Sequence, residues 1–265
     1  MKGRFRERWS VNLSYYERQE NFRGSVIFIN RVLSALPKAD LAALIPDMVE
    51  ATWGPGEVLY ESGGPVTEAH FPSSAGLSVV KVMGDGTCVE CATVGSESAV
   101  GLLPALSGGV SSNRTFVQLA GSGISIPAAA LRGRARQSPA LVDLLLRFAQ
   151  VTLAQEEQSV ACNALHETEP RLARWILQSQ DRLNARVLPL TQDYLAIMLG
   201  VQRTTVGAAA SRLKAEGLIR YSRGQLEVLD RPGLERRSCE CYGAVRDLQA
   251  RLLAPDESND DPGTL

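Results

Sequence analysis

The stretch Leu190–Asp230 constrains the fold of this chain more than any other, because it reads as two short helices, a turn and a hairpin. Apolar residues follow Thr191, a favourable N-cap, at helical spacing. They stop at Gly200, which supplies the permissive backbone that a tight turn needs. Ala196, Gly200 and Val206 recur at offsets that let two helices pack closely at a steep angle. The spacing therefore predicts a helix-turn-helix.

The second helix and the hairpin after it complete this pattern. The helix is expected to start with Thr204 or Thr205 near its cap and to stop at Gly217, a typical residue just beyond a helix. Short strands are expected at Leu218–Tyr221 and Leu226–Leu229, around a turn with a basic tip. A helix-turn-helix followed directly by such a hairpin predicts a winged helix.

Arginines and polar residues occupy the places from which a winged helix reaches DNA. Arg203 stands at the exposed start of the second helix, where a guanidinium suits paired hydrogen bonds to guanine. The other positions expected to contact bases or phosphates are Thr191, Gln192, Gln202, Thr204, Thr205, Ser211, Arg212, Arg220, Ser222 and Arg223. The sequence thus predicts binding to double-stranded DNA. A winged helix that docks on a protein is the alternative.

The distribution of charge favours DNA although the total does not. The chain has a net charge of −1, with 45% hydrophobic and 22% charged residues, as in soluble globular proteins. Arg171–Arg251 holds 14 basic and 8 acidic residues, whereas the rest holds 14 and 21. The sequence has five cysteines, no membrane-spanning run and no apolar leader. We therefore expect free thiols, no membrane partner and a cytoplasmic location.

Glycine-cornered strands precede the winged helix and predict an antiparallel roll or sandwich, so that the fold class is α+β. Two short helices come first, with Asp40 as the expected cap of the second. A short strand follows within Gly54–Pro65. The later strands are expected at His70–Pro72, Leu77–Met83, Thr87–Val94, Thr115–Leu119 and Gly123–Ile126.

A long helix is expected from Ser138 and Pro139, because apolar residues follow at nearly heptad spacing. The residues assigned to this dimer seam are Leu141, Leu144, Leu145, Phe148, Val151, Thr152 and Gln155. The seam predicts a homodimer whose winged helices read half-sites about 34–36 Å apart. The expected units are a flexible extension (1–29), the roll (30–137), the dimer helix and hinge (138–166), the winged helix (167–253) and a disordered acidic tail (254–265).

Taken in this order, the elements resemble the Crp/Fnr family of bacterial transcription regulators over about residues 30–253. The most specific parts are LTQDYLAIMLGVQRTTV, GLIRYSRGQLEVLD and the motif Cys239-Glu240-Cys241-Tyr242. The resemblance implies a β-roll like a cyclic-nucleotide-binding domain, a helical dimer, and DNA binding that activates or represses transcription. It also admits RNA polymerase as a partner.

The effector pocket of the family is only half present. Members that bind cyclic AMP hold the ribose with a glutamate before a Gly-Leu step and the cyclic phosphate with an Arg-Ser or Arg-Thr pair. Here Ala99 takes the place of that glutamate, after Glu97 and Ser98, whereas Arg114 and Thr115 match the phosphate pair. We expect an unidentified effector or none, with a cyclic-AMP-dependent regulator as the alternative.

The sequence predicts no metal, cofactor or catalytic residue. Cys88 and Cys91 lie three apart on an expected strand and so point to opposite faces. A four-cysteine site that joins them to Cys239 and Cys241 is the alternative to ordinary thiols. Haem sensing would rest on one of the two histidines, His70 and His166. A cupin-like enzyme needs a histidine cluster with a carboxylate, which two distant histidines do not supply.

Overall fold

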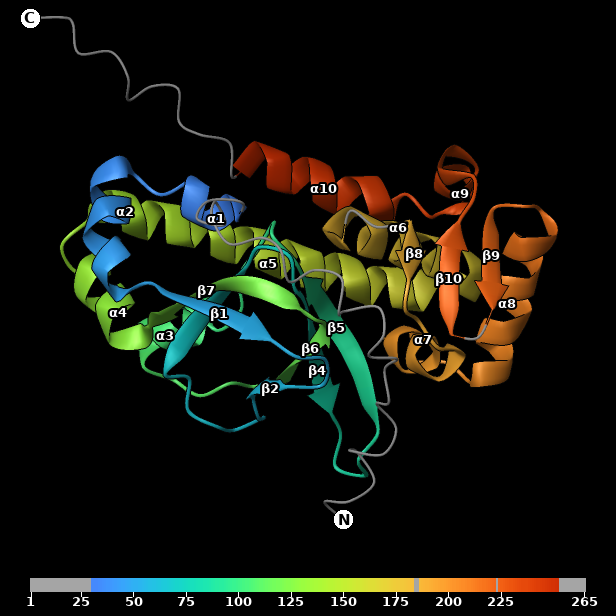
Figure 1. The fold of residues 1–265 in the computed structure, drawn as a ribbon, viewed down its shortest axis with the longest axis horizontal. Coiled ribbons are helices and arrows are strands. Elements are labelled where there is room, and N and C mark those ends of the chain that lie inside the picture. The colour runs from blue at the N-terminus through green and yellow to red at the C-terminus, as the bar shows by residue number, and fades with distance from the viewer. Residues whose placement is uncertain (1–29, 184–185, 223, 253–265) are drawn as a thin grey trace, which may run out of the picture.

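The computed structural model describes residues 30–183, 186–222 and 224–252. The expected N-terminal extension, the acidic tail and Arg223 lie outside the described residues. In the described part, a β-roll and a winged helix lie side by side along one long helix, α5 (Pro139–Leu165) (Figure 1). No helix of this part is long and apolar enough to cross a membrane.

Two antiparallel sheets form the roll, as the glycine-cornered strands predict. The first sheet has the order β1 (Val49–Trp53), β7 (Gly121–Pro127), β3 (Glu68–Pro72). The second has the order β2 (Val58–Tyr60), β6 (Arg114–Leu119), β4 (Gly76–Val82), β5 (Cys88–Val94). Their inner faces share a core in which Phe71, Leu77 and Ile126 are fully buried. Sequence reasoning missed strand β1, although its residues VEATW alternate between apolar and polar side chains, as in a half-buried strand.

Short helices close the ends of the roll. They are α1 (Arg31–Ser34), α2 (Lys38–Leu44), the 3-10 turn Ile45–Asp47, α3 (Leu102–Ser107) and α4 (Ala128–Ala135). Asp40 lies inside α2, so the expected cap is wrong. Its buried carboxylate instead accepts hydrogen bonds from Arg134 Nε at 2.5 Å and from Ser138 Oγ at 2.7 Å. Asp40 therefore joins α2 to the start of α5.

Helix α5 begins as expected, because Ser138 Oγ accepts a hydrogen bond from the amide of Leu141 at 3.1 Å and Pro139 follows it. The face of α5 that the sequence assigned to the dimer seam is a different face from the one exposed in the structure. Five of the seven residues assigned to the dimer seam are buried within the chain itself: Leu141, Leu144, Leu145, Phe148 and Val151. The first four belong to the core of the roll. The exposed apolar stripe of α5 is a different one, formed by Val142, Leu146, Leu153 and Val160.

The C-terminal part forms the predicted winged helix. Its elements are α6 (Thr168–Leu183), β8 (Val187–Leu188), α7 (Gln192–Leu199), α8 (Arg203–Ala215), β9 (Ile219–Ser222), β10 (Gln225–Val228), α9 (Arg231–Arg237) and α10 (Cys241–Leu252). The wing is a three-stranded sheet in the order β8-β10-β9, with β8 an addition to the expected hairpin. Helix α10 returns along α5 (Figure 1).

The roll and the winged helix share apolar and polar contacts. Val80 and Phe116 from the roll belong to the hydrophobic cluster that forms the core of the winged helix. Beside them, Trp175 Nε1 of α6 donates a hydrogen bond to Glu90 Oε2 of β5 at 2.7 Å. Burial raises the pKa of the Glu90 carboxyl above its ordinary value. The two parts are therefore packed against each other through β4, β5 and β6.

Candidate nucleic-acid interface

The turn between α7 and α8 has the geometry that its sequence predicts. Gly200 adopts a φ of 63°, in the left-handed region that favours glycine. The amide of Val201 bonds to the carbonyl of Ala196 at 3.0 Å, and the Thr191 hydroxyl caps α7 by accepting from the amide of Tyr194 at 3.1 Å. Val206 is fully buried between the two helices. These contacts fix the direction in which α8 leaves the turn.

The first turn of α8 presents exposed donors to solvent. Arg203, Thr204 and Thr205 are all exposed, and Gln202 occupies the N-cap without a side-chain cap. The turn contains no acidic residue, so the positive end of the helix dipole is not neutralised within the helix. Arg203 Nη1 lies 3.4 Å from Asp193 Oδ2, between side chains that are more than half exposed. Such a surface pair costs little to exchange for a phosphate or a base.

The remaining predicted contacts differ in how they are held. Arg212 is ion-paired with Glu169 of α6, and Arg220 Nη1 lies 2.7 Å from Glu227 Oε2 on the neighbouring strand. Ser211 and Ser222 are exposed, and Gln192 packs against Gly207 of α8. All three arginines are exposed, but Arg212 and Arg220 donate hydrogen bonds to their carboxylates, whereas Arg203 lies 3.4 Å from Asp193.

The wing is tighter than expected. Its strands pair from Gln225–Ser222 to Val228–Ile219, so that the turn has two residues. Gly224 in that turn has a φ of 74°. The predicted strand ends are therefore displaced by one residue, because the turn contains fewer residues than the polar composition indicates. Arg223 of this turn is outside the described residues.

Each residue predicted for an effector pocket makes contacts of its own within the roll or at its edge. Glu97 Oε1 accepts a hydrogen bond from Arg182 Nε of α6 at 2.8 Å, which places it at the contact with the winged helix. Ala99 is buried, and Arg114 Nη2 lies 3.6 Å from Glu61 Oε1. The Ser98 carbonyl accepts from Asn30, while the Thr115 side chain is buried in β6.

The Gly-Leu step has a structural explanation within the roll. Gly101 has a φ of 75°, and a Cβ there would collide with the Tyr60 hydroxyl. That hydroxyl donates to the Glu68 carbonyl at 2.8 Å. Close packing alone thus demands glycine at this position. Next to it, a cavity of about 340 Å³ is lined by residues that include Tyr60, His70 and Ser125.

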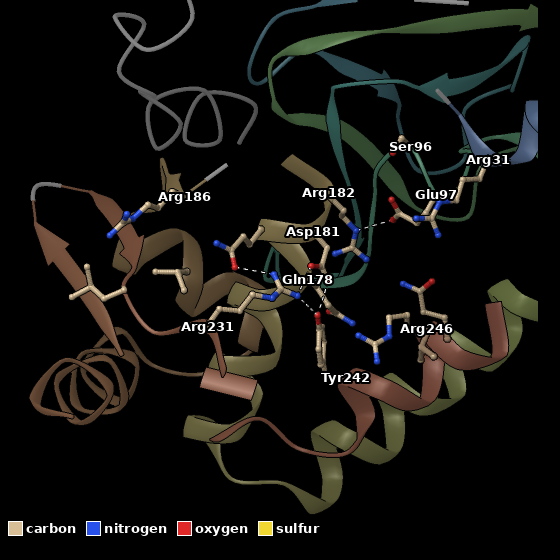
Figure 2. A pocket seen from close by; sticks show the side chains of 15 residues that line it. Arg31, Ser96, Glu97, Gln178, Asp181, Arg182, Arg186, Arg231, Tyr242 and Arg246 are labelled. Atoms are coloured by element: carbon tan, nitrogen blue, oxygen red, sulfur yellow. Dashed lines mark hydrogen bonds and ion pairs between the residues drawn. The ribbon is translucent and has the colours of Figure 1, made fainter. Parts of the chain in front are cut away.

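A larger cavity lies between the roll, α5, α6 and α10, and it has a volume of about 780 Å³ (Figure 2). Arg182 and Glu97 meet on one wall, while Arg231 reaches toward Tyr242 on another (Figure 2). Arg231 also contacts Asp181 of α6 at 2.7 Å. Arg182 and Arg231, which line the cavity, are thus already bonded to other residues of the chain. Sequence reasoning missed this cavity because its lining residues are far apart in the sequence.

The histidines and cysteines occupy three separate places. His70 is buried in the roll, where its Nδ1 lies 2.7 Å from Ser125 Oγ, and burial lowers its pKa to about 4. Cys91 is the extra residue of a bulge in β5, opposite Val79 and Val80. Cys239 and Cys241 come together with Cys162 and His166, and not with the cysteines of β5. Sequence spacing did not indicate this group, because Cys162 precedes Cys239 by a whole domain.

The comparisons with known proteins agree with this architecture. The described residues form a β-roll, a long helix and a winged helix, in that order along the chain. Residues 170–237 match the family described as the Crp-like helix-turn-helix domain. The chain thus carries a Crp-like helix-turn-helix domain and has the fold of the Crp/Fnr transcription regulators. No curated protein sequence matches it.

Solved structures resemble the chain over most of their length. FixK2 from Bradyrhizobium japonicum is 18% identical, with a TM-score of 0.64 over 72% of this chain and 98% of that one. TTHA1359, a Crp/Fnr transcriptional regulator from Thermus thermophilus, is 21% identical, with a TM-score of 0.61 over 72% and 98%. CLP of Xanthomonas campestris, described as a c-di-GMP-responsive global regulator, is 13% identical, with a TM-score of 0.60 over 72% and 99%. These likenesses establish the fold.

Proposed function

We propose that this protein is a sequence-specific DNA-binding transcription regulator that reads its operator through the start of α8. The observation that carries the proposal is the exposed group Arg203, Thr204 and Thr205, in a domain that matches the Crp-like helix-turn-helix. An arginine in this position can bond to both acceptors of guanine in the major groove. The positive end of α8 favours a phosphate beside it.

A homodimer is the second part of the proposal, and the exposed stripe on α5 supports it. Leu146, Leu153 and Val160 recur every seven residues and are 63%, 56% and 71% exposed. A seven-residue apolar repeat is that of a two-stranded coiled coil, and the opposite face of α5 already fills the core of its own chain. We therefore assign the stripe to a second copy of α5. A two-fold axis then sets the half-sites one DNA turn apart, about 34–36 Å.

The roll (30–137) is the part that we assign to regulation, with 138–166 as dimer helix and hinge and 167–253 as DNA-binding unit. Cyclic AMP is not the effector that we propose. Glu97 is engaged by Arg182, and Ala99 offers no side-chain acceptor for a ribose hydroxyl. The regulator is controlled by another effector or acts constitutively, and RNA polymerase is the partner that activation would require.

Selection of bound duplexes from a random DNA pool tests the proposal directly. Purified full-length protein would be incubated at moderate salt, with and without cyclic AMP. We expect a two-fold-symmetric site with half-sites about one helical turn apart, recovered in both arms. Recovery only with cyclic AMP would overturn our assignment of the effector. Absence of any enriched sequence, together with weak salt dependence of binding, would favour a winged helix that docks on protein.

Two variants then connect the site to the structure. Arg203→Ala should weaken binding to the selected site by about 1–3 kcal/mol and relax the preference for guanine. The matched control is Arg136→Ala, which removes the same charge from an exposed position at the end of α4. Equal losses in both variants would show that only net charge matters. For the dimer, Leu153→Glu should give monomers in sedimentation experiments. A dimer that persists in this variant would show that the stripe is not the dimer interface.

A further inference from the structure

Three cysteines and a histidine meet where the long helix ends. Cys162 and His166 are four residues apart at the C-terminal end of α5, so both side chains lie on one face of the helix. Cys239 lies in the short link between α9 and α10, and Cys241 is the first residue of α10. The four ligand atoms lie within 4.8 Å of one another, and the three cysteines are buried as a cluster of their own.

Two distances between ligand atoms in this group are close to the edges of a metal tetrahedron. Zinc binds Cys sulfur at about 2.3 Å and His nitrogen at about 2.0–2.1 Å, so a tetrahedron has S–S edges of about 3.8 Å and S–N edges of about 3.6 Å. Cys162 Sγ and Cys239 Sγ are 3.6 Å apart. Cys241 Sγ and His166 Nδ1 are 3.5 Å apart. The space suits one ion.

Groups around the cluster orient the ligands. The Nε2 atom of His166 lies 3.2 Å from Glu240 Oε1, which leaves Nδ1 directed at the sulfurs. A carboxylate on the far ring nitrogen is the usual outer partner of a metal-bound histidine. Gln158 Nε2 donates to Cys241 Sγ at 2.9 Å, a contact suited to a thiolate. His166 and Cys241 thus each have an outer partner that restrains the side chain.

The charges nearby match a metal with thiolates. Three thiolates and a neutral imidazole around a divalent ion carry one net negative charge, which is costly to bury without a cation. Arg171 and Arg174 are buried, at 7% and 9% exposure, next to the cluster. The Nε atom of each is buried and has no hydrogen-bond partner among the described residues. A metal–thiolate group would balance these guanidinium charges.

We propose that Cys162, His166, Cys239 and Cys241 bind one Zn²⁺ ion in a closed, tetrahedral structural site. Four protein ligands leave no position for a substrate, so the ion serves to hold the chain together. It would tie the end of the dimer helix to α9 and α10, beside the start of the winged helix. The same sulfurs would form a Cys162–Cys239 disulfide in the competing arrangement, and an iron–sulfur cluster would need more room between its ligands.

Metal analysis of the full-length protein tests the site without any DNA assay. The protein would be purified under reducing conditions, incubated with Zn²⁺ and freed of unbound ion. We expect about one zinc per chain and, after exchange for Co²⁺, the visible bands of a tetrahedral thiolate complex. A zinc content below about a tenth per chain, a Cys162–Cys239 disulfide in the reduced preparation, or iron with sulfide would each overturn the proposal.

Variants locate the ion. Cys241→Ser should weaken the Co²⁺ thiolate bands, because one of three sulfur ligands is lost, whereas Cys88→Ser and Cys91→Ser, which lie outside the cluster, should leave them unchanged. Glu240→Ala removes only the exposed outer partner of His166, so the fold should persist while zinc affinity falls roughly tenfold against a chromophoric chelator. The metal would lie elsewhere if Glu240→Ala left zinc affinity unchanged and the two β5 variants weakened the Co²⁺ bands as much as Cys241→Ser does. Circular dichroism would establish that each variant is folded.

Discussion

Replacing Trp175 with phenylalanine should loosen the contact between the roll and the winged helix. The indole Nε1 donates at 2.7 Å to Glu90, which also accepts a hydrogen bond from Ser78 Oγ at 2.7 Å. A hydrogen bond to a charged acceptor contributes about 1.5–3 kcal/mol, and phenylalanine cannot make it. Because the ring also packs edge-on against Tyr194, phenylalanine keeps most of the apolar contact. The loss of stability in Trp175→Phe should therefore come mainly from the missing hydrogen bond.

A double-mutant cycle isolates this bond. Urea unfolding would be measured for the wild type, Trp175→Phe, Glu90→Ala and the double variant. We expect a coupling free energy of about 1.5–3 kcal/mol and a fall in Tm of about 3–10 °C for Trp175→Phe. Two additive substitutions, with a coupling below about 0.5 kcal/mol, would refute the reasoning. The matched control is Trp53→Phe, because Trp53 is buried in the roll away from α6.

Three further predictions concern stability. Gly200→Ala should destabilise the protein by about 1–2 kcal/mol in urea unfolding, because the φ of 63° is strained for alanine, whereas Gly207→Ala inside α8 should be neutral or stabilise it. His70 has a pKa lowered to about 4, so stability should fall on the order of 3 kcal/mol as the pH drops from about 6.5 to 4, and His70→Gln should flatten this pH profile of Tm. Asp40→Asn should cost about 1–3 kcal/mol in the same unfolding assay, because Arg134 loses its buried carboxylate; an unchanged midpoint would contradict that role.

The sequence predicted what short-range patterns determine. Gly200 and Gly217 mark the ends of α7 and α8 because backbone conformation there is a local property. The face of α5 could not be assigned in that way. Leu144 and Leu146 are equally apolar, and only the position of the roll decides that the first is buried and the second exposed. Periodicity identifies an apolar face, but not its partner.

The residues that sequence reasoning missed are those joined over long separations. Cys162 meets Cys239 across 77 positions, and Glu97 meets Arg182 across 85. No spacing rule connects such pairs, because the intervening elements decide where the ends lie. Cys239 and Cys241, two residues apart, carried a signal of their own, but their partners lie at the end of α5 and not on β5.

The core of the winged helix is completed by residues of another part of the chain. Val80 and Phe116 project from the roll into the cluster that contains Trp175 and Leu195. An engineer who grafts residues 167–253 onto a different roll would therefore expose part of that cluster to water. A working chimera has to bring a matching apolar face with a carboxylate in the place of Glu90. The roll thus supplies part of the core of the domain beside it.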